Sequence, residues 1–309
     1  MDWYWKCAID SVKGILPFQN QLRALKYKLI PYRGDPANER STIEQGILQV
    51  EWVRRARPWE GIVVLEVGTG WQPLIPAVFS LAGAGEVVLA DSNRLLTASS
   101  FHSALEGLRR EKKLLMERLS LTEKQFDQAL DWKLEQGLEE GLRRFRMRYL
   151  APCDCRRLDL PAGSVDLVTS RAVMEHIPPG VIQDIFIESF RLLRPGGLTQ
   201  HIVDNSDHWE FNDKRLSRVN FLRFSNGVFR WTHLNSLDYQ NRLRHSQYVD
   251  MLRKAGFQIV REEKTVDAQS LEALKTLPLD PQFRRFSQED LAAITTFVLA
   301  EKVQSTSAP

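Results

Sequence analysis

Short runs of apolar residues alternate with amphipathic stretches from about residue 40 to the end of the chain. Uninterrupted apolar runs are typical of strands that a sheet buries on both faces, whereas apolar residues three and four apart indicate helices. The runs that we interpret as strands are GIVVLEVG (61–68), EVVLAD (86–91), residues 149–154, SVDLVTS (164–170), LTQHIVD (198–204), QIV (258–260) and TTFVLAEKV (295–303). Their alternation with helices predicts an α/β fold with a seven-stranded, mostly parallel sheet and helices on both faces.

Turn and capping residues mark the ends of the predicted helices. Residues 31–38 form a turn-rich break, after which Ser41 can cap a helix over 42–56. The other predicted helices are the one that Pro178 and Pro179 open and RPGG (194–197) stops, residues 246–254, and one that begins at Ser287.

Two segments are longer than the sheet requires. Between the second and third predicted strands lie two sets of apolar residues with helical spacing, the second capped by Thr122 and Gln125. We therefore predict a helical hairpin inserted at about 95–146. The other long segment, 205–244, is rich in aromatic residues and arginine. It follows the end of a strand, where α/β enzymes keep substrate contacts.

The first 57 residues precede the predicted sheet, and we predict that they form an N-terminal helical extension to an α/β domain over 58–305. Their first part is aromatic and basic, with Trp3, Tyr4 and Trp5 at the start. Such a segment can pack on the domain and cover its ligand, or it can lie as a helix on a membrane surface. The sequence leaves both alternatives open.

The first predicted strand runs into the loop LEVGTGWQPLIP (65–76). A Gly-x-Gly loop lets the backbone approach a ligand and directs N–H groups toward it. A dinucleotide fingerprint needs a further glycine where this chain has Pro73, and the Gly-Lys-Ser/Thr of a phosphate loop is absent. Glu66, just before the glycines, is a poor neighbour for a pyrophosphate but suits a ligand that carries an ammonium group.

A second carboxylate, Asp91, ends the next apolar run, 21 residues after Gly70. A carboxylate at this place can accept hydrogen bonds from ribose hydroxyls. One acid suits an amino-acid ammonium and the other suits a ribose. Together, Glu66 and Asp91 favour S-adenosylmethionine over NAD as the ligand.

Four motifs in sequence order strengthen this interpretation: LEVGTG, VLAD, PCDCRRLDLPAGSVDLVTSRAVMEHIPP and RLLRPGGL. They resemble the successive motifs of class I S-adenosylmethionine-dependent methyltransferases, and the chain is similar to the large type 11 family. The resemblance covers about 61–204, with the helical hairpin as an insertion. The segment that begins HIVDNSDHWEF (201–211) also resembles a bacterial subgroup of such proteins. Gln72 departs from the pattern, because many members have a third glycine there.

The resemblance implies a Rossmann-like methyltransferase sheet, S-adenosylmethionine as cofactor and a set of contacts to it. It places Glu66 near the ammonium, Gly68, Thr69 and Gly70 around the methionine part, Asp91 at the ribose, Asp154 at the adenine amino group and Cys155 beside the adenine ring. Asp159 competes with Asp154 for the adenine contact, but Asp154 lies nearer the end of a predicted strand.

Methyl transfer to a hydroxyl benefits from a base with a pKa near neutral, which favours histidine. His208 follows the fifth predicted strand, with Asp204 and Asp207 nearby to orient it. His176 lies just past the fourth strand, where it can act on the acceptor or pack under the prolines that follow. The candidate catalytic residues are therefore His208, Asp207 and His176.

Composition limits the partners and the compartment. The net charge of +3 over 309 residues gives no nucleic-acid signal. Three cysteines without a disulfide framework, and no recognisable signal peptide, suggest a cytoplasmic protein. The pair Cys153 and Cys155 has no second pair to complete a zinc site. Asp204, Asp207 and His208 could bind a metal, but no fourth ligand is indicated, and we expect none.

The acceptor is the least determined part. The arginines of 205–244 can be solvated, or they can grip a carboxylate or phosphate in an acceptor pocket. No base-methylation motif follows the fourth strand. We therefore expect O-methylation of a small-molecule or glycan-like acceptor in a biosynthetic reaction, without nucleic acid. The alternatives are a non-catalytic subunit that binds S-adenosylmethionine for a partner, or a methyltransferase acting on nucleic acid or protein. Peripheral membrane contact stays open.

Overall fold

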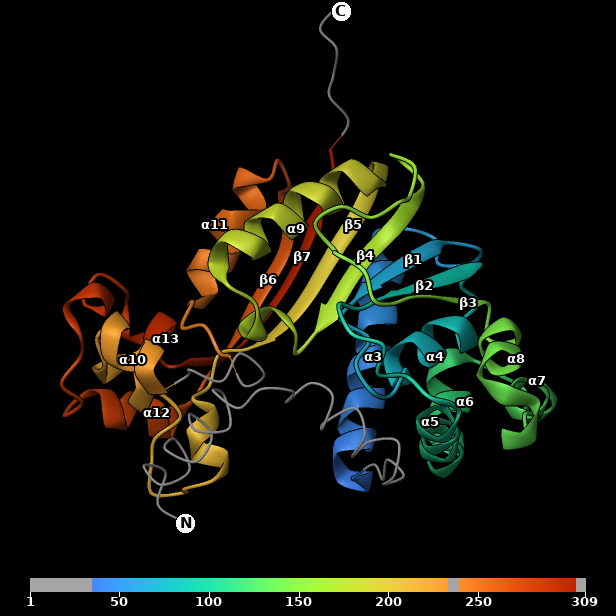
Figure 1. Cartoon of the computed structure of the whole chain (residues 1–309), viewed down its shortest axis with the longest axis horizontal. Helices are drawn as coiled ribbons and strands as arrows, with labels where there is room; N and C mark the ends of the chain where they lie inside the picture. The colour runs from blue at the N-terminus through green and yellow to red at the C-terminus, as the bar shows by residue number, and fades with distance from the viewer. Residues whose placement is uncertain (1–34, 233–238, 304–309) are drawn as a thin grey trace, which may run out of the picture. The chain divides into compact units, whose positions relative to one another are not determined.

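The computed structural model describes residues 35–232 and 239–303. The aromatic start of the chain, with its two alternatives, lies outside these residues. The described strands form one seven-stranded sheet in the order β3-β2-β1-β4-β5-β7-β6 (Figure 1). The strands are β1 (Val63–Val67), β2 (Glu86–Ala90), β3 (Met147–Leu150), β4 (Val165–Arg171), β5 (Leu193–Asp204), β6 (Gln258–Val266) and β7 (Ala293–Glu301).

The pairing makes the sheet mixed rather than parallel throughout. Strand β2 pairs parallel with β1 and β3, and β1 pairs parallel with β4. Strands β6 and β7 are antiparallel. The N–H of Asn205 donates to the carbonyl of Ile294 at 2.9 Å and that of Gly196 to Lys302 at 2.7 Å, so β5 and β7 also run in opposite directions. The predicted seven-stranded α/β fold is confirmed.

Helices and short 3₁₀ turns connect these strands. None of the described helices combines the length and hydrophobicity that crossing a bilayer needs. The α-helices are α3 (Pro36–Ala56), α4 (Leu74–Leu81), α5 (Ala98–Arg110), α6 (Lys112–Leu119), α7 (Glu123–Leu130), α8 (Gly137–Arg144), α9 (Pro179–Leu192), α10 (Asn226–Thr232), α11 (His245–Lys254), α12 (Ala268–Leu274) and α13 (Gln288–Leu291). The 3₁₀ turns are η1 (Leu134–Gln136), η2 (Met174–His176), η3 (His208–Phe211), η4 (Asn220–Arg223) and η6 (Pro281–Phe283).

Several predicted boundaries were wrong. Strand β3 covers Met147–Leu150 rather than 149–154, and β6 continues to Val266 rather than ending at residue 260. Helix α3 begins at Pro36 rather than after Ser41, because Asp35 caps it by accepting the N–H of Ala37 at 3.2 Å. Proline suits the first helical position, where its missing N–H costs nothing. The RPGG sequence does not form a loop after α9; it lies inside β5, which follows the helix directly.

The described chain divides into two compact units. We call the first the glycine-loop unit; it contains residues 35–170, 188–200 and 302–303. We call the second the histidine unit; it contains residues 171–187, 201–232 and 239–301. Helix α9 and strand β5 contribute residues to both.

A buried carboxylate ties together the strands of the glycine-loop unit. Asp166, only 1% exposed, lies near the start of β4. It accepts the N–H of Val63 in β1 at 2.8 Å and a guanidinium bond from Arg57 at 2.8 Å, and it pairs with Arg194 of β5. Two arginines and one backbone N–H therefore compensate the burial of this charge.

The predicted insertion consists of helices α5 to α8 with their own aromatic core (Figure 1). The Phe101 ring meets Trp132 edge-on at 5.1 Å between centroids and Phe145 at 5.7 Å. Thr122 and Gln125 form the predicted capping box at the start of α7. Gly141 of α8 lies against this core, since a Cβ there would come within 2.6 Å of the Phe101 ring.

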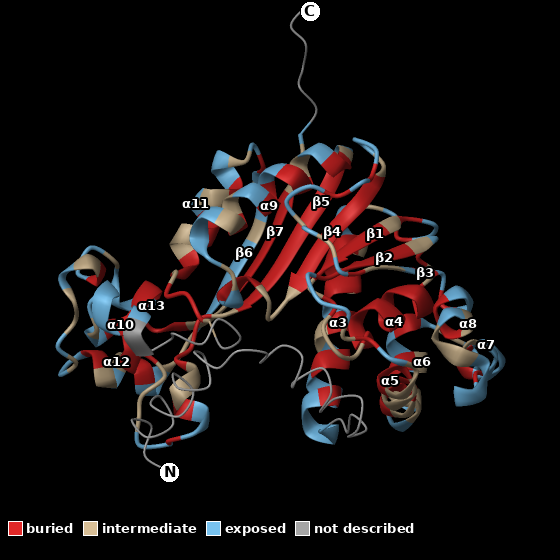
Figure 2. Cartoon of the chain, in the orientation of Figure 1, coloured by how far each residue is buried: buried red, intermediate tan, exposed pale blue. Residues whose placement is uncertain are grey.

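The histidine unit has a second core and an exposed sheet edge. Residues of η4, α10, α12 and α13 pack into one apolar cluster. Helix α11 contacts both β6 and β7. Figure 2 shows β7 largely buried, whereas exposed residues recur along β6, which ends the strand order.

Replacing Gly141 with alanine tests the packing of the insertion. The added methyl overlaps the Phe101 ring, so we expect Gly141→Ala to lose roughly 1–3 kcal/mol of unfolding free energy in urea titration. Gly180→Ala is the matched control, because no described atom lies within 4 Å of its Cβ position. Equal stability of the two variants would show that the insertion core is loosely packed.

Candidate functional site

The glycine loop follows β1 and has the backbone that its sequence predicts. Gly68 and Gly70 have φ angles of +81° and +66°, which L side chains rarely adopt. The space beside Gly70 is open: among the described residues, no atom lies within 4 Å of the position that a Cβ would take. Between the glycines, Thr69 is 7% exposed, and its hydroxyl has no hydrogen-bond partner in the described part of the chain. Both features fit a loop that receives a ligand.

Asp91, at the end of β2, organises this loop. Its Oδ2 accepts the N–H of Gly70 at 2.8 Å and its Oδ1 accepts the N–H of Asn93 at 2.8 Å. Its backbone carbonyl accepts the N–H of Cys153 at 2.9 Å, which brings in the loop after β3. Each carboxylate oxygen has a second lone pair for a ribose hydroxyl. Glu66, 6% exposed, lies near the end of the adjacent strand β1.

Gln72 occupies the position where many family members have a third glycine, and its side chain serves the scaffold. The amide donates to Oε1 of Glu39 in α3 at 2.9 Å and to Ser103 in α5 at 3.0 Å. Glu39 is only 2% exposed and also pairs with Arg110. The loop is therefore fastened to two helices by a buried polar network.

Asp154 and Cys155, which were predicted to contact the adenine, lie in the loop after β3. Asp154 is exposed, and both its oxygens bind the Arg156 guanidinium, the shortest contact being 2.7 Å. These bonds lower the pKa of Asp154 to about 2. Burial raises the pKa of the Cys155 thiol, which also contacts Cys153. Asp159 is exposed as well. The choice between Asp154 and Asp159 stays a prediction.

In the histidine unit, three potential ligand groups converge. Glu175 and His176, in η2 after β4, and His208, at the start of η3 after β5, each place one donor atom within 4.8 Å of the others. The two imidazole rings are 5.2 Å apart, and Phe211, which is 56% exposed, stacks on His208 at 5.1 Å. The sequence predicted both histidines as candidates, and the structure brings them together.

Residues 239–241 hold this cluster in place. The carbonyl of Tyr239 lies 2.9 Å from Nδ1 of His176. Gln240 accepts the N–H of His208 at 3.3 Å and donates to the carbonyl of Ser206 at 2.5 Å. The side-chain amide of Asn241 donates to the carbonyls of Met174 and Ile177, and its backbone N–H donates to the backbone carbonyl of Glu175. One short segment therefore fixes both histidine turns.

The two aspartates near His208 have different surroundings. Oδ2 of Asp204 lies 3.5 Å from Nε2 of His208, a long contact without good hydrogen-bond geometry. Burial would raise the pKa of Asp204, but contacts with His208 and Ser206 together hold it below its usual value. Asp207 is fully buried, and its carboxylate caps η3 by accepting the N–H of Trp209 at 2.9 Å. Burial raises the pKa of Asp207 to about 6.

Glu175 is the site residue that sequence analysis missed. It is 2% exposed, and neither carboxylate oxygen has a hydrogen-bond partner within the described ranges. Burial, followed by the nearby charge of Asp204, raises its pKa to about 8. The backbone N–H groups of Glu175 and Asp204 oppose this shift, although neither reaches hydrogen-bond geometry. The only sequence signal was its place beside His176.

Comparison with known proteins identifies the family. Residues 40–262 match the family described as a methyltransferase domain. The chain belongs to this methyltransferase family. It is an S-adenosylmethionine-dependent methyltransferase, in agreement with the open glycine loop and the two buried acids.

Solved structures that are similar include such a methyltransferase from Mesorhizobium loti, 15% identical with a TM-score of 0.44, over 81% of this chain and 96% of the other. Another, from Methanosarcina mazei, is 14% identical with a TM-score of 0.45, over 82% and 97%. A phosphoethanolamine N-methyltransferase from Haemonchus contortus is 18% identical with a TM-score of 0.44, over 84% of this chain and 53% of its own. No curated protein sequence matches the chain.

Two arginines of this methyltransferase belong to the segment 205–244, for which binding of an acceptor carboxylate or phosphate was one alternative. Both have structural roles instead. The Arg242 guanidinium lies 4.2 Å from the Phe229 ring centroid and donates to the carbonyls of Phe221 and Phe224. Burial lowers its pKa to about 10. Arg244 is 1% exposed and donates to the carbonyl of Asn205 at 2.9 Å. Their hydrogen bonds hold the segment after β5 together.

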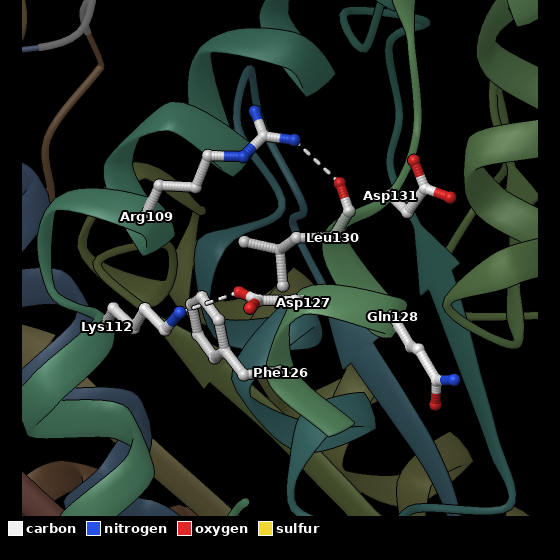
Figure 3. A pocket seen from close by; sticks show the side chains of 7 residues that line it. All are labelled: Arg109, Lys112, Phe126, Asp127, Gln128, Leu130 and Asp131. Atoms are coloured by element: carbon white, nitrogen blue, oxygen red, sulfur yellow. Dashed lines mark hydrogen bonds and ion pairs between the residues drawn. The ribbon is translucent and has the colours of Figure 1, made fainter. Parts of the chain in front are cut away.

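The insertion of the methyltransferase carries a separate surface hollow of about 640 Å³ (Figure 3). Its cations already have partners. Lys112 pairs with Asp127 and Glu123, each at 2.8 Å, and Arg109 donates to the carbonyl of Leu130 at 2.6 Å. The lining of this hollow includes none of the residues predicted to bind the cofactor or to act in catalysis.

His201 in β5 is a structural histidine and gives the protein a pH dependence. It is buried against the Phe186 ring at 4.9 Å, and burial lowers its pKa to about 3 from the ordinary 6.5. Below pH 6.5 the imidazole of His201 is protonated in the unfolded chain but stays neutral in the folded protein. Acid therefore favours unfolding. Between pH 7.5 and 5.5 the wild type should lose about 1.4 kcal/mol more unfolding free energy than His201→Phe. Parallel pH profiles in urea titration would contradict this assignment.

Proposed function

We propose that this methyltransferase transfers the methyl group of S-adenosylmethionine to a hydroxyl oxygen of a small-molecule or glycan-like acceptor, in a biosynthetic reaction in the cytoplasm. The observation that carries the proposal is the cluster of His176 and His208 with Glu175, beside Asp204. Groups of this kind remove a proton from a hydroxyl at neutral pH. An amine acceptor would need less help of this kind once it is neutral.

The glycine-loop unit would hold the cofactor. Gly68, Thr69 and Gly70 would surround its methionine part, Glu66 would face the ammonium and Asp91 the ribose. The support is the open space at Gly70, the Thr69 hydroxyl without a partner among the described residues, and the fixed Asp91 carboxylate. Asp154 and Cys155 would meet the adenine. When bound, the cofactor supplies an electrophilic methyl on a positively charged sulfur.

The histidine unit would act on the acceptor. His208 would accept the hydroxyl proton, and Asp204 at 3.5 Å would stabilise the resulting imidazolium. Removal of this proton would leave the acceptor oxygen as the nucleophile that the electrophilic methyl group requires. The exposed Phe211 ring, stacked on His208, offers an apolar face for the body of the acceptor.

The cofactor assignment predicts the effect of removing Asp91. Asp91→Ala deletes the acceptor for ribose and releases the N–H of Gly70, so binding of S-adenosylmethionine should weaken by roughly 1–3 kcal/mol in isothermal titration. Asp131→Ala, in the insertion hollow, is the control and should bind normally. Tight binding of NAD, or an unchanged affinity in Asp91→Ala, would contradict the assignment.

The acceptor assignment predicts which fraction of a lysate takes up labelled methyl groups. Label should enter small molecules or glycans, and His208→Ala should lose roughly 100-fold in turnover while still binding cofactor. His102→Ala, in α5 of the insertion, serves as the histidine control. Label in nucleic acid or protein would contradict the proposal of a small-molecule or glycan-like acceptor. Cofactor binding without transfer to any fraction would favour the non-catalytic subunit.

A further inference from the structure

The cluster of Glu175, His176 and His208 has features that proton transfer alone does not explain. The three donor atoms lie within 4.8 Å of one another, and they come from two turns that the segment 239–241 holds together. Two imidazoles and one carboxylate form a donor set that borderline divalent cations prefer.

The first feature is the burial of the carboxylate. Glu175 is 2% exposed, and both oxygens lack hydrogen-bond partners in the part of the chain that the structure describes. Buried polar groups almost always have such partners, because an unsatisfied one costs free energy. A cation bound at the same place would compensate this carboxylate.

The second feature is the orientation of His176. Its Nδ1 lies 2.9 Å from the carbonyl oxygen of Tyr239. A carbonyl can only accept, so Nδ1 carries the proton and Nε2 keeps its lone pair. Histidine ligands of metals commonly donate their other ring N–H to a carbonyl in this way, which fixes the tautomer and the ring.

The third feature is the position of His208. Its ring centroid lies 5.2 Å from that of His176, with the two planes tilted by 54°. One donor atom of each ring belongs to the cluster. Oδ2 of Asp204 lies 3.5 Å from Nε2 of His208 and supplies a further negative charge beside the cluster. Asp207, which the sequence suggested as a ligand, instead caps η3.

We propose that Glu175, His176 and His208 bind one divalent first-row transition metal ion, such as Zn²⁺ or Fe²⁺. Ligand atoms about 2.0–2.1 Å from a tetrahedral ion are roughly 3.4 Å apart. The separations between the ligand atoms, at most 4.8 Å here, would therefore shorten by up to about 1.4 Å on binding. Three protein ligands leave a coordination position open, as in catalytic rather than structural sites.

The role of the ion rests on the proposed function, although its binding does not. An acceptor hydroxyl at the open position would lose its proton more easily, since the cation stabilises the alkoxide. The proton would pass to Asp204 or to water, and His208 would then serve as a ligand instead of the base. The loss of turnover expected for His208→Ala holds in either case.

Metal titration of the full-length protein tests the site directly. The protein is purified without a histidine tag, stripped with EDTA and titrated with Co²⁺ under visible spectroscopy, and Zn²⁺ content is measured after equilibration. We expect one ion per chain with roughly micromolar affinity or tighter. Changes around a metal ligand alone cost 10–100-fold in affinity. Loss of a ligand in His176→Asn, His208→Asn or Glu175→Gln should therefore cost at least about 100-fold.

The control is His245→Asn, which removes a histidine of the same unit outside the cluster and should bind Co²⁺ as the wild type does. Substoichiometric or millimolar binding, or normal binding by the three ligand variants, would overturn the proposal. The binding result is independent of the acceptor. Metal-free protein that still methylates a hydroxyl would overturn the catalytic role of the ion, whereas the Co²⁺ titration alone decides whether the site exists. Stoichiometric metal binding with methyl transfer to nitrogen would retain the site and sink the proposed acceptor.

Discussion

The hydrogen bond from the backbone of Gly70 to the carboxylate of Asp91 is the contact on which the arrangement of the candidate cofactor site depends. It joins the loop after β1 to the end of β2, and the carbonyl of the same aspartate holds Cys153 in the loop after β3. Three loops that are distant in sequence are thus arranged around one residue. Since both carboxylate oxygens already accept a backbone N–H, the aspartate is held in place before any ligand arrives.

In the histidine unit, hydrogen bonds from one short segment hold the candidate site residues in place. The candidate catalytic side chains of this unit lie on two short turns, which would be mobile if they were held only by their own backbone bonds. Gln240 and Asn241 supply the missing constraint, because their side-chain amides bind carbonyls of both turns. The buried arginines Arg242 and Arg244, next in the chain, anchor this segment in turn. The polar residues of the segment from Gln240 to Arg244 therefore help to fix the positions of the candidate catalytic side chains.

The sequence was sufficient for the seven strands and the insertion, because apolar periodicity and strand ends are local signals. The sequence could not reveal the structural role of Gln72, because the partners of this side chain, Glu39 and Ser103, lie more than 30 residues away in the chain. Glu175 was missed for the same reason: its importance comes from burial without partners in the described structure, which no local pattern encodes. The sequence also left the role of Arg242 open between a solvated and a ligand-binding side chain, because its partners, the Phe229 ring and the carbonyl of Phe221, come together only in the fold.

The exposed strand β6 ends the strand order of the sheet. Edge strands invite pairing with other chains unless charges or bulges prevent it. Here Arg261 pairs with Glu263, and Lys264 lies 3.8 Å from Glu289. The pairing with β7 is also irregular at two places. A second copy that added a strand at this edge would have to desolvate these charges, so the strand resists aggregation and directs any self-association to other surfaces.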